Sequence, residues 1–170
     1  MTAATESCAL GEAADLEASE YVTVTVADQM FGLAIDRVHD VFIASALTTV
    51  PLAPPEIVGL LNLRGRVVTA MCLRRRLGLP DREGGRREMA VGLEHQGESY
   101  GLLVDEIGEV MKLSPTSHEP NPVHLDKRWI GLSRGVHRLE HGLLIILDID
   151  AGFRRRGPRR MSIIFQEFFR

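Results

Sequence analysis

The chain has 170 residues, 45% of them hydrophobic and 25% charged, which is an ordinary composition for a globular protein. This length predicts one domain or two small lobes. The net charge of −3 argues against a chain-wide attraction to DNA or to anionic lipid. The charge is polarised, because residues 1–20 carry five acids and no base, whereas residues 154–170 carry six arginines against Glu167.

The cysteines and the N-terminal residues indicate the cellular compartment of the protein. Cys8 and Cys72 form no disulfide framework and no metal-binding spacing, which fits a reducing compartment. The first residues lack a basic region followed by an apolar stretch, so no signal peptide is predicted. No segment reaches the roughly 18 apolar residues that a transmembrane helix needs. We therefore expect a cytoplasmic protein without direct membrane insertion.

The first half of the chain predicts a disordered acidic tail at residues 1–18 and then a series of short strands. The strict alternation from Tyr21 to Val26 predicts a half-buried strand, and a turn at Asp28-Gln29 leads to the next one. Pro51, Pro54 and Pro55 exclude regular structure around them, since proline lacks the N–H group. The expected strands are 21–26, 30–35, 37–42, 57–63 and 67–73.

The second half of the chain also predicts short strands joined by turns and loops. Residues 74–77 predict one helical turn that Gly78 closes, and residues 81–87 predict a polar loop. Two hairpins are expected, separated by a strand that bends near Gly108 and by a loop at 114–122. The expected strands are 89–93, 100–104, 105–113, 132–139 and 143–149. Short strands with glycine-rich turns predict an all-β protein, most simply two small five-stranded barrels.

No catalytic motif is present: there is no phosphate-binding glycine loop, dinucleotide fingerprint, zinc-protease motif or C-x-x-C pair. His137 and His141 lie on the two arms of the last predicted hairpin and would face each other as a metal pair, unless they are exposed turn residues. Asp148 and Asp150 would share one face of a strand, where two carboxylates can do acid–base work or remain solvated. We expect no enzyme activity, no catalytic residue, no cofactor and no metal.

The stretch Asn62-Leu63-Arg64-Gly65 stands where two apolar strands reverse. Gly65 tolerates a positive φ and permits the tight turn. A phosphate cradle would need several glycines and a following helix, and a nucleic-acid grip would need interleaved aromatics. The pattern therefore predicts a rigid turn that presents one arginine, Arg64. The alternative is that Arg64 ties down the turn or pairs with a carboxylate such as Asp40.

Taken in order, these segments resemble the CheW family, the coupling proteins of bacterial chemosensory arrays. The motif around Arg64 is specific because the other segments occur with it in the order typical of the family. The resemblance covers about residues 20–152. Its parts are the opening strand with Phe31-Gly32-Leu33, Ile35 to Val41, Pro51 with Pro54-Pro55, Ile57 to Gly65, Val67 to Leu73, Arg74 to Leu79, Tyr100 to Asp105, and the closing hairpin into Leu147-Asp148-Ile149.

The resemblance implies two five-stranded SH3-like barrels with a groove between them, and a non-enzymatic adaptor at membrane-associated chemoreceptor arrays. One face would bind the regulatory domain of the histidine kinase CheA, and the groove would bind the cytoplasmic hairpin tip of a chemoreceptor. Arg64 matches the family's functional arginine, and Asp40 stands where the family usually has glutamate. The receptor- and kinase-contacting positions implied are Arg64, Asp40, Val38, Val41, Asn62 and Gly65.

The family commonly has proline and then aspartate where this chain has Thr69 and Cys72, which leaves the particular receptor and kinase open. Two other classes also stay open. A small nucleic-acid-binding barrel, suggested by the arginines, predicts binding that weakens steeply with salt; the missing surface aromatics and the net negative charge argue against it. A small-molecule or catalytic barrel predicts a closed apolar pocket with convergent polar groups.

The predicted domain of two intertwined lobes spans residues 19–152, and residues 153–170 predict a basic, amphipathic tail. About ten residues are too few for a stable isolated helix, so this segment needs a surface to lie on. We expect the protein's own barrel surface, with a partner or self-association, or an anionic membrane, as alternatives. The apolar positions at the spacing of one helical face are Met161, Ile164, Phe165, Phe168 and Phe169.

Overall fold

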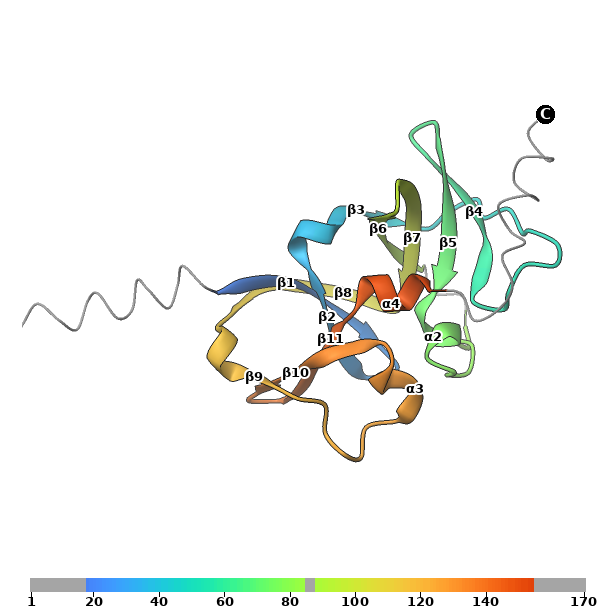
Figure 1. Cartoon of the computed structure of the whole chain (residues 1–170). Helices are drawn as coiled ribbons and strands as arrows, with labels where there is room; N and C mark the ends of the chain where they lie inside the picture. The colour runs from blue at the N-terminus through green and yellow to red at the C-terminus, as the bar shows by residue number, and fades with distance from the viewer. Residues whose placement is uncertain (1–17, 85–87, 155–170) are drawn as a thin grey trace, which may run out of the picture.

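The computed structural model describes residues 18–84 and 88–154, which form two β-sheet lobes packed against each other (Figure 1). The chain builds two strands of lobe 1, crosses to lobe 2 for the next five, and returns to lobe 1 for the last four. Lobe 1 is therefore made from two distant segments, with lobe 2 inserted between them. This arrangement confirms the predicted all-β fold of two small lobes.

Lobe 1 is a six-stranded sheet in the order β8-β1-β2-β11-β10-β9. Neighbouring strands are antiparallel, except that β11 and β2 run parallel. The sheet has one strand more than the five predicted because the two-residue β9 joins its edge. The strands are β1 (Ser19–Val26), β2 (Gln29–Ala34), β8 (Glu106–Leu113), β9 (His118–Glu119), β10 (Ser133–Leu139) and β11 (Gly142–Leu147).

Lobe 2 is a five-stranded sheet in the order β3-β6-β7-β5-β4, in which β5 and β7 run parallel. The three prolines lie in the linker between β3 and β4, as predicted, and a backbone bridge from Thr48 to Leu60 ties this linker to the sheet. The strands are β3 (Val38–Ile43), β4 (Ile57–Leu63), β5 (Arg66–Cys72), β6 (Met89–His95) and β7 (Glu98–Val104).

Short helices occupy the connections, and they correct two predictions. Strand was expected at Ile35 and Arg37, but both lie in a 3-10 turn. The prediction that Asp148 and Asp150 share one face of a strand is wrong, because Asp148 caps a helix by accepting a hydrogen bond from the Ala151 N–H. The helices are η1 (Ile35–Arg37), α2 (Leu73–Arg76), η2 (Pro115–Ser117), α3 (Lys127–Ile130) and α4 (Ile149–Phe153).

No helix within residues 18–84 and 88–154 is long and apolar enough to cross a membrane. The predicted acidic tail, apart from Ala18, and the apolar stripe of the predicted C-terminal tail lie outside the described residues. Phe153, which was assigned to that tail, is instead the last residue of α4 and packs against the core.

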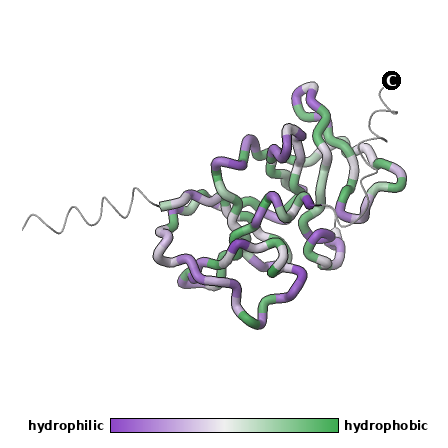
Figure 2. Tube along the Cα trace, in the orientation of Figure 1, coloured by the Kyte–Doolittle hydropathy of each residue, from purple (hydrophilic) through white to green (hydrophobic). Residues whose placement is uncertain are grey.

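The main apolar core lies between the two lobes. It joins residues such as Val24 and Phe31 of lobe 1 to Val91 and Leu102 of lobe 2, and all four are at most 5% exposed. Apolar stretches along the strands of both lobes alternate with hydrophilic turns (Figure 2). A second, smaller cluster fills the inside of lobe 2 and consists of Leu61, Val68, Ala70, Ala90 and Leu103.

Candidate partner-binding surface

The β4–β5 hairpin carries the motif found in the sequence, and it projects at one end of lobe 2 (Figure 1). Its two-residue turn has a positive φ at both Arg64 (50°) and Gly65 (83°), as a type I′ turn requires. Gly65 adopts this backbone readily, whereas an arginine is strained there. Asn62 stabilises the turn, because its side-chain oxygen accepts a hydrogen bond from the Gly65 N–H at 3.0 Å. The predicted tight turn at Gly65 is confirmed.

Arg64 is exposed and forms no hydrogen bond or ion pair with any other described residue. The Asp40 carboxylate instead accepts a hydrogen bond from the N–H of its neighbour Val41 at 2.8 Å. The alternative in which Arg64 pairs with Asp40 is therefore not realised. A guanidinium with all five N–H donors unused is suited to a partner's carboxylates or carbonyls. Arg66, on the other side of the turn, is also exposed and offers a matched comparison.

Val38 and Val41 are three positions apart, which would place them on opposite faces of a regular strand. A bulge between Val38 and Asp40 changes this, so that Val38 lies opposite Leu93 and Val41 lies opposite Val91. Leu93 and Val91 share one face of β6 and belong to the core between the lobes. Val38 and Val41 therefore share the face of lobe 2 that is turned toward lobe 1.

The two valines differ in exposure. Val38 is half-buried against the inter-lobe core, whereas Val41 is 42% exposed and the adjoining Ile43 is 48% exposed. Because β3 is an edge strand, Val41 and Ile43 extend the inter-lobe face past the part that lobe 1 covers. We call these two side chains the β3 strip. Asp40 lies opposite Gly92, on the other face of the strand.

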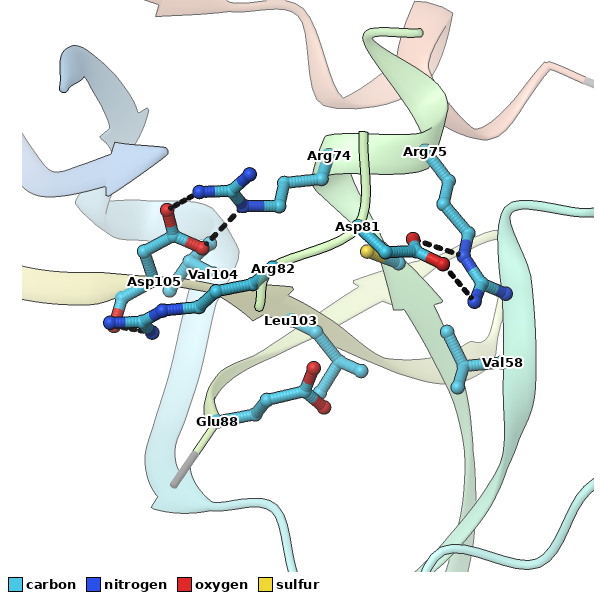
Figure 3. A pocket seen from close by; sticks show the side chains of 10 residues that line it. Val58, Arg74, Arg75, Asp81, Arg82, Glu88, Leu103, Val104 and Asp105 are labelled. Atoms are coloured by element: carbon cyan, nitrogen blue, oxygen red, sulfur yellow. Dashed lines mark hydrogen bonds and ion pairs between the residues drawn. The ribbon is translucent and has the colours of Figure 1, made fainter. Parts of the chain in front are cut away.

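A pocket of about 160 Å³ lies beside α2 and contains arginines and acids in similar number (Figure 3). Arg74 donates two hydrogen bonds to Asp105, at 2.6 and 2.8 Å, and Arg75 donates two to Asp81, both at 2.8 Å. These guanidinium partners hold the pKa values of both carboxyls below their usual range. Both arginines are thus already neutralised, which does not favour a phosphate or nucleic-acid site.

Asp105 has a second role that its sequence position does not reveal. Its carboxylate also accepts a hydrogen bond from the Ala27 N–H at 2.9 Å, in the β1–β2 turn of lobe 1. Arg74, its ion-pair partner, belongs to lobe 2. The pair is only 14–16% exposed and ties the lobes together at one side of the interface.

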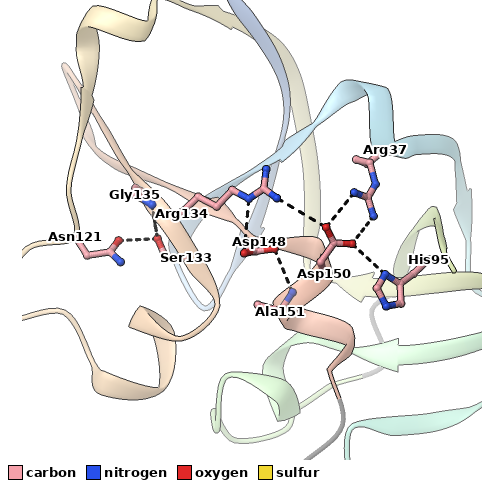
Figure 4. A network of polar contacts seen from close by, with 9 residues as sticks. All are labelled: Arg37, His95, Asn121, Ser133, Arg134, Gly135, Asp148, Asp150 and Ala151. Atoms are coloured by element: carbon pink, nitrogen blue, oxygen red, sulfur yellow. Dashed lines mark hydrogen bonds and ion pairs between the residues drawn. The ribbon is translucent and has the colours of Figure 1, made fainter.

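A second tie centres on Asp150 in α4 (Figure 4). Its carboxylate accepts a hydrogen bond from Arg37 at 2.8 Å and lies 3.1 Å from His95 Nδ1, on β6 of lobe 2. The Arg37 guanidinium is the main reason why the pKa of Asp150 falls to about 2. Phe153 stacks on His95 with ring centroids 5.4 Å apart. The aspartate that the sequence offered as a possible acid–base group therefore fastens α4 across the two lobes.

The structure does not bring His137 and His141 together as a metal pair, and the alternative of exposed turn residues holds for His141 but not for His137. His137 is 2% exposed on β10, whereas His141 lies in the exposed β10–β11 turn. His137 Nδ1 is 2.9 Å from Ser117 Oγ, and its ring contacts Tyr21 and His118. Burial, with a smaller contribution from His118, lowers the pKa of His137. No group of three or more His, Cys, Asp or Glu side chains gathers as a metal site within the described ranges.

The structure thus places the predicted positions in three groups: Asn62, Arg64 and Gly65 at the hairpin turn, Val38 and Val41 on the inter-lobe face, and Asp40 on the opposite face of β3. Sequence reasoning missed the inter-lobe ties, because no motif announces a contact between distant segments. Alternation alone would also have separated Val38 from Val41, since a bulge is not visible in the pattern of apolar residues.

Two small β-sheet lobes packed against each other, with the exposed Arg64 on a hairpin turn that projects from one of them, place the chain in the class of two-lobed all-β domains. The family model for the CheW-like domain matches residues 20–156. The chain belongs to this family, which confirms the resemblance.

Individual relatives agree with this assignment. The chain is 27% identical over 134 residues to the chemotaxis protein CheW of Rhizobium meliloti, covering 79% of this chain and 86% of the relative. It is 26% identical over 135 residues to the CheW of Thermotoga maritima, covering 79% and 87%. Among solved structures it resembles the scaffolding protein TtCheW from Thermoanaerobacter tengcongensis, with a TM-score of 0.74, 27% identity and coverage of 85% of this chain and 98% of that one.

Proposed function

We propose that this protein is a chemotaxis coupling protein, a non-enzymatic adaptor that joins chemoreceptor tips to a CheA-type histidine kinase. The observation that carries the proposal is Arg64, which has no partner among the described residues and lies on a turn stabilised by Asn62 within a CheW-like domain. This role places the protein in the cytoplasm, at membrane-associated chemoreceptor arrays.

The chemistry of the surface suits a helical hairpin as receptor partner. The β3 strip supplies exposed apolar area at the boundary between the lobes, against which the ridges of a helix can pack. Arg64 supplies directional hydrogen bonds to carboxylates or backbone carbonyls. Signalling contacts of this kind bury modest areas, so a few residues decide their affinity. The kinase regulatory domain would occupy another face of the domain, leaving the β3 strip to the receptor.

The proposal is tested by measuring affinity for a CheA regulatory domain and for a receptor-tip fragment, with RNA as a control. Val41→Asp places an unpaired charge on the β3 strip, which costs on the order of several kcal/mol when a partner covers it. We expect this variant to lose receptor binding and to keep kinase-domain binding. Val38→Asp is less suitable, because Val38 is half-buried against the core and its replacement would also disturb folding.

Val123→Asp is the control, because Val123 is 99% exposed in the loop between β9 and α3 of lobe 1 and belongs to neither apolar core. It should bind both partners like the unchanged protein. Equal loss of both partners in Val41→Asp would contradict the proposed division of the surfaces. Binding of RNA that weakens steeply with salt, without binding of either protein, would support the nucleic-acid alternative instead.

A further inference from the structure

The last described residues, at the end of α4, lie against an exposed face of lobe 2. Phe153, at the end of α4, contacts Tyr100 with ring centroids 4.4 Å apart and the rings tilted by 37°. The Arg154 carbonyl accepts a hydrogen bond from Arg76 at 3.0 Å, and the same guanidinium binds the carbonyl of Gly152 at 2.9 Å. These contacts hold the end of α4 against lobe 2, beside Tyr100 and Arg76.

Strand register shows which side chains continue this face. Tyr100 lies beside Thr69 on β5, and Thr69 lies opposite Leu60 on β4. Two residues further along β5, Val67 has the same orientation and is 50% exposed. Leu60 is half-buried, but it packs against neither apolar core of the described residues. We call Leu60, Val67 and Thr69 the hairpin face. It lies on β4 and β5, next to the turn that carries Arg64.

The segment that follows has the composition to cover such a face. Five of its apolar residues, from Met161 to Phe169, have the spacing of one helical face, and they would need a surface because so short a helix is unstable alone. The basic residues of 155–160 come first, and the exposed Glu98 lies beside the end of α4 on the same face of the sheet as Tyr100. Glu98 accepts a hydrogen bond from the Tyr100 hydroxyl at 2.6 Å.

The geometry also allows the contact. Val67 is one neighbouring strand and two residues from Tyr100, a separation of about 8 Å. Six extended residues, 155–160, span up to about 20 Å, so the apolar stripe reaches the hairpin face without displacing α4. Covalent attachment gives the segment an effective concentration in the millimolar range, which favours this occupant over a second copy of the chain.

We propose that residues 161–169 dock on the hairpin face and that the arginines before them lie against Glu98. The docked segment would cover Val67, opposite Asn62, and would obstruct a partner that binds Arg64. This last consequence rests on the proposed function. The family match ends at residue 156, so the docking segment is an addition to the CheW-like domain that regulates access to its hairpin.

Docking is tested without any partner. A spin label is attached to Ser162→Cys in a Cys8→Ser background, and the methyl NMR signals of Val67 and Leu60 are compared with those of Val110. We expect the signals of Val67 and Leu60 to broaden while that of Val110 does not. Val67→Glu should abolish the broadening at Leu60, and Val110→Glu, a change at an equally exposed valine, should not. Absent or uniform broadening overturns the proposal, as does broadening that disappears on dilution with unlabelled chains, which would identify a second copy as the occupant.

Competition is tested separately with a chain truncated after Arg154, which retains all of α4 and its contacts to Arg76. If about one molecule in ten has the hairpin face uncovered, truncation should raise receptor-tip affinity about tenfold. Unchanged affinity would overturn competition even where the NMR result supports docking. Failure of both forms to bind a receptor tip would instead overturn the proposed function, and the docking result would stand.

Discussion

The interiors of the two lobes are built differently, although both lobes are small β-sheets of similar size. The cluster inside lobe 2 is wholly apolar, with Leu61, Val68, Ala70, Ala90 and Leu103 all buried. The two buried polar side chains of the described residues, Thr23 and His137, both lie in lobe 1. Tyr21 contacts His137 although two strands separate β1 from β10 in the sheet, so the lobe 1 sheet curls around this polar face.

The polar interior of lobe 1 depends on irregular segments for its hydrogen bonds. The Thr23 hydroxyl donates to the carbonyl of Glu109 at 2.8 Å, where the pairing of β1 with β8 shifts register. His137 contacts Ser117 in η2. A pocket of about 420 Å³ opens at this end and is lined in part by Tyr21 and His118. The interior of lobe 1 is therefore polar and borders a pocket, whereas the interior of lobe 2 is apolar, and we expect the stability of lobe 1 to depend more strongly on pH.

The largest expected effect on the free energy of unfolding comes from shortening one buried leucine side chain in each lobe, which tests the contrast between the two interiors. Leu61→Ala in lobe 2 and Leu144→Ala in lobe 1 remove the same atoms from sites that are 2% and 0% exposed. Each should lower the free energy of unfolding by about 2–5 kcal/mol. Leu61→Ala should cost more, since an apolar interior cannot refill with water. Urea unfolding measures the loss of free energy in both variants. A larger loss in Leu144→Ala would contradict the proposed difference between the two interiors.

The next effect concerns a tie that both lobes share. Asp105→Asn leaves Arg74, which is 16% exposed, without its counter-charge, and should lower the free energy of unfolding by about 3 kcal/mol. Because the tie spans the interface, the NMR signals of both lobes should shift together. Asp81→Asn, which breaks the exposed pair with Arg75, is the control and should change stability little. Shifts confined to lobe 2 would show that Asp105 does not couple the lobes.

A smaller effect is the pH dependence of lobe 1. The pKa of His137 is below its ordinary value of 6.5 in the folded chain, so the unfolded chain takes up this proton at higher pH. Stability should therefore fall as pH drops from 7.5 to 5.5, before the paired carboxylates, whose pKa values are lowered, begin to protonate. Urea unfolding at both values should show a weaker pH dependence in His137→Gln. An unchanged dependence would assign it to other groups, of which His118 is the nearest.

The smallest effect on stability is expected at the hairpin turn. Arg64→Asn removes the guanidinium and supplies a residue that adopts positive φ more readily, so stability should change by about 0–1 kcal/mol, if anything upward. Receptor-tip affinity should nevertheless fall. Arg66→Asn, on the other side of the turn, serves as the control and should bind normally. A large drop in melting temperature with unchanged affinity would make Arg64 a structural residue.

Local patterns in the sequence determined most of the strands and turns. Alternation at Tyr21–Val26 and glycine at Gly65 act over a few residues, so their effect is visible without the rest of the chain. The strand Ile57–Leu63 was predicted with the bounds that the structure has. At two positions the predicted strand was wrong. Asp148 ends β11 by capping α4, and Ile35 lies in a 3-10 turn.

Only the tertiary structure decided which distant residues meet. The Asp105–Ala27 and Asp150–His95 contacts join positions 78 and 55 residues apart, and no sequence spacing encodes such a pairing. The β3 bulge likewise depends on β6 as a partner, and it alone brings Val38 and Val41 to one face. The burial of His137 follows from the curl of a whole sheet. Local propensity acts through neighbouring residues, whereas burial and long-range pairing exist only once the chain has closed on itself.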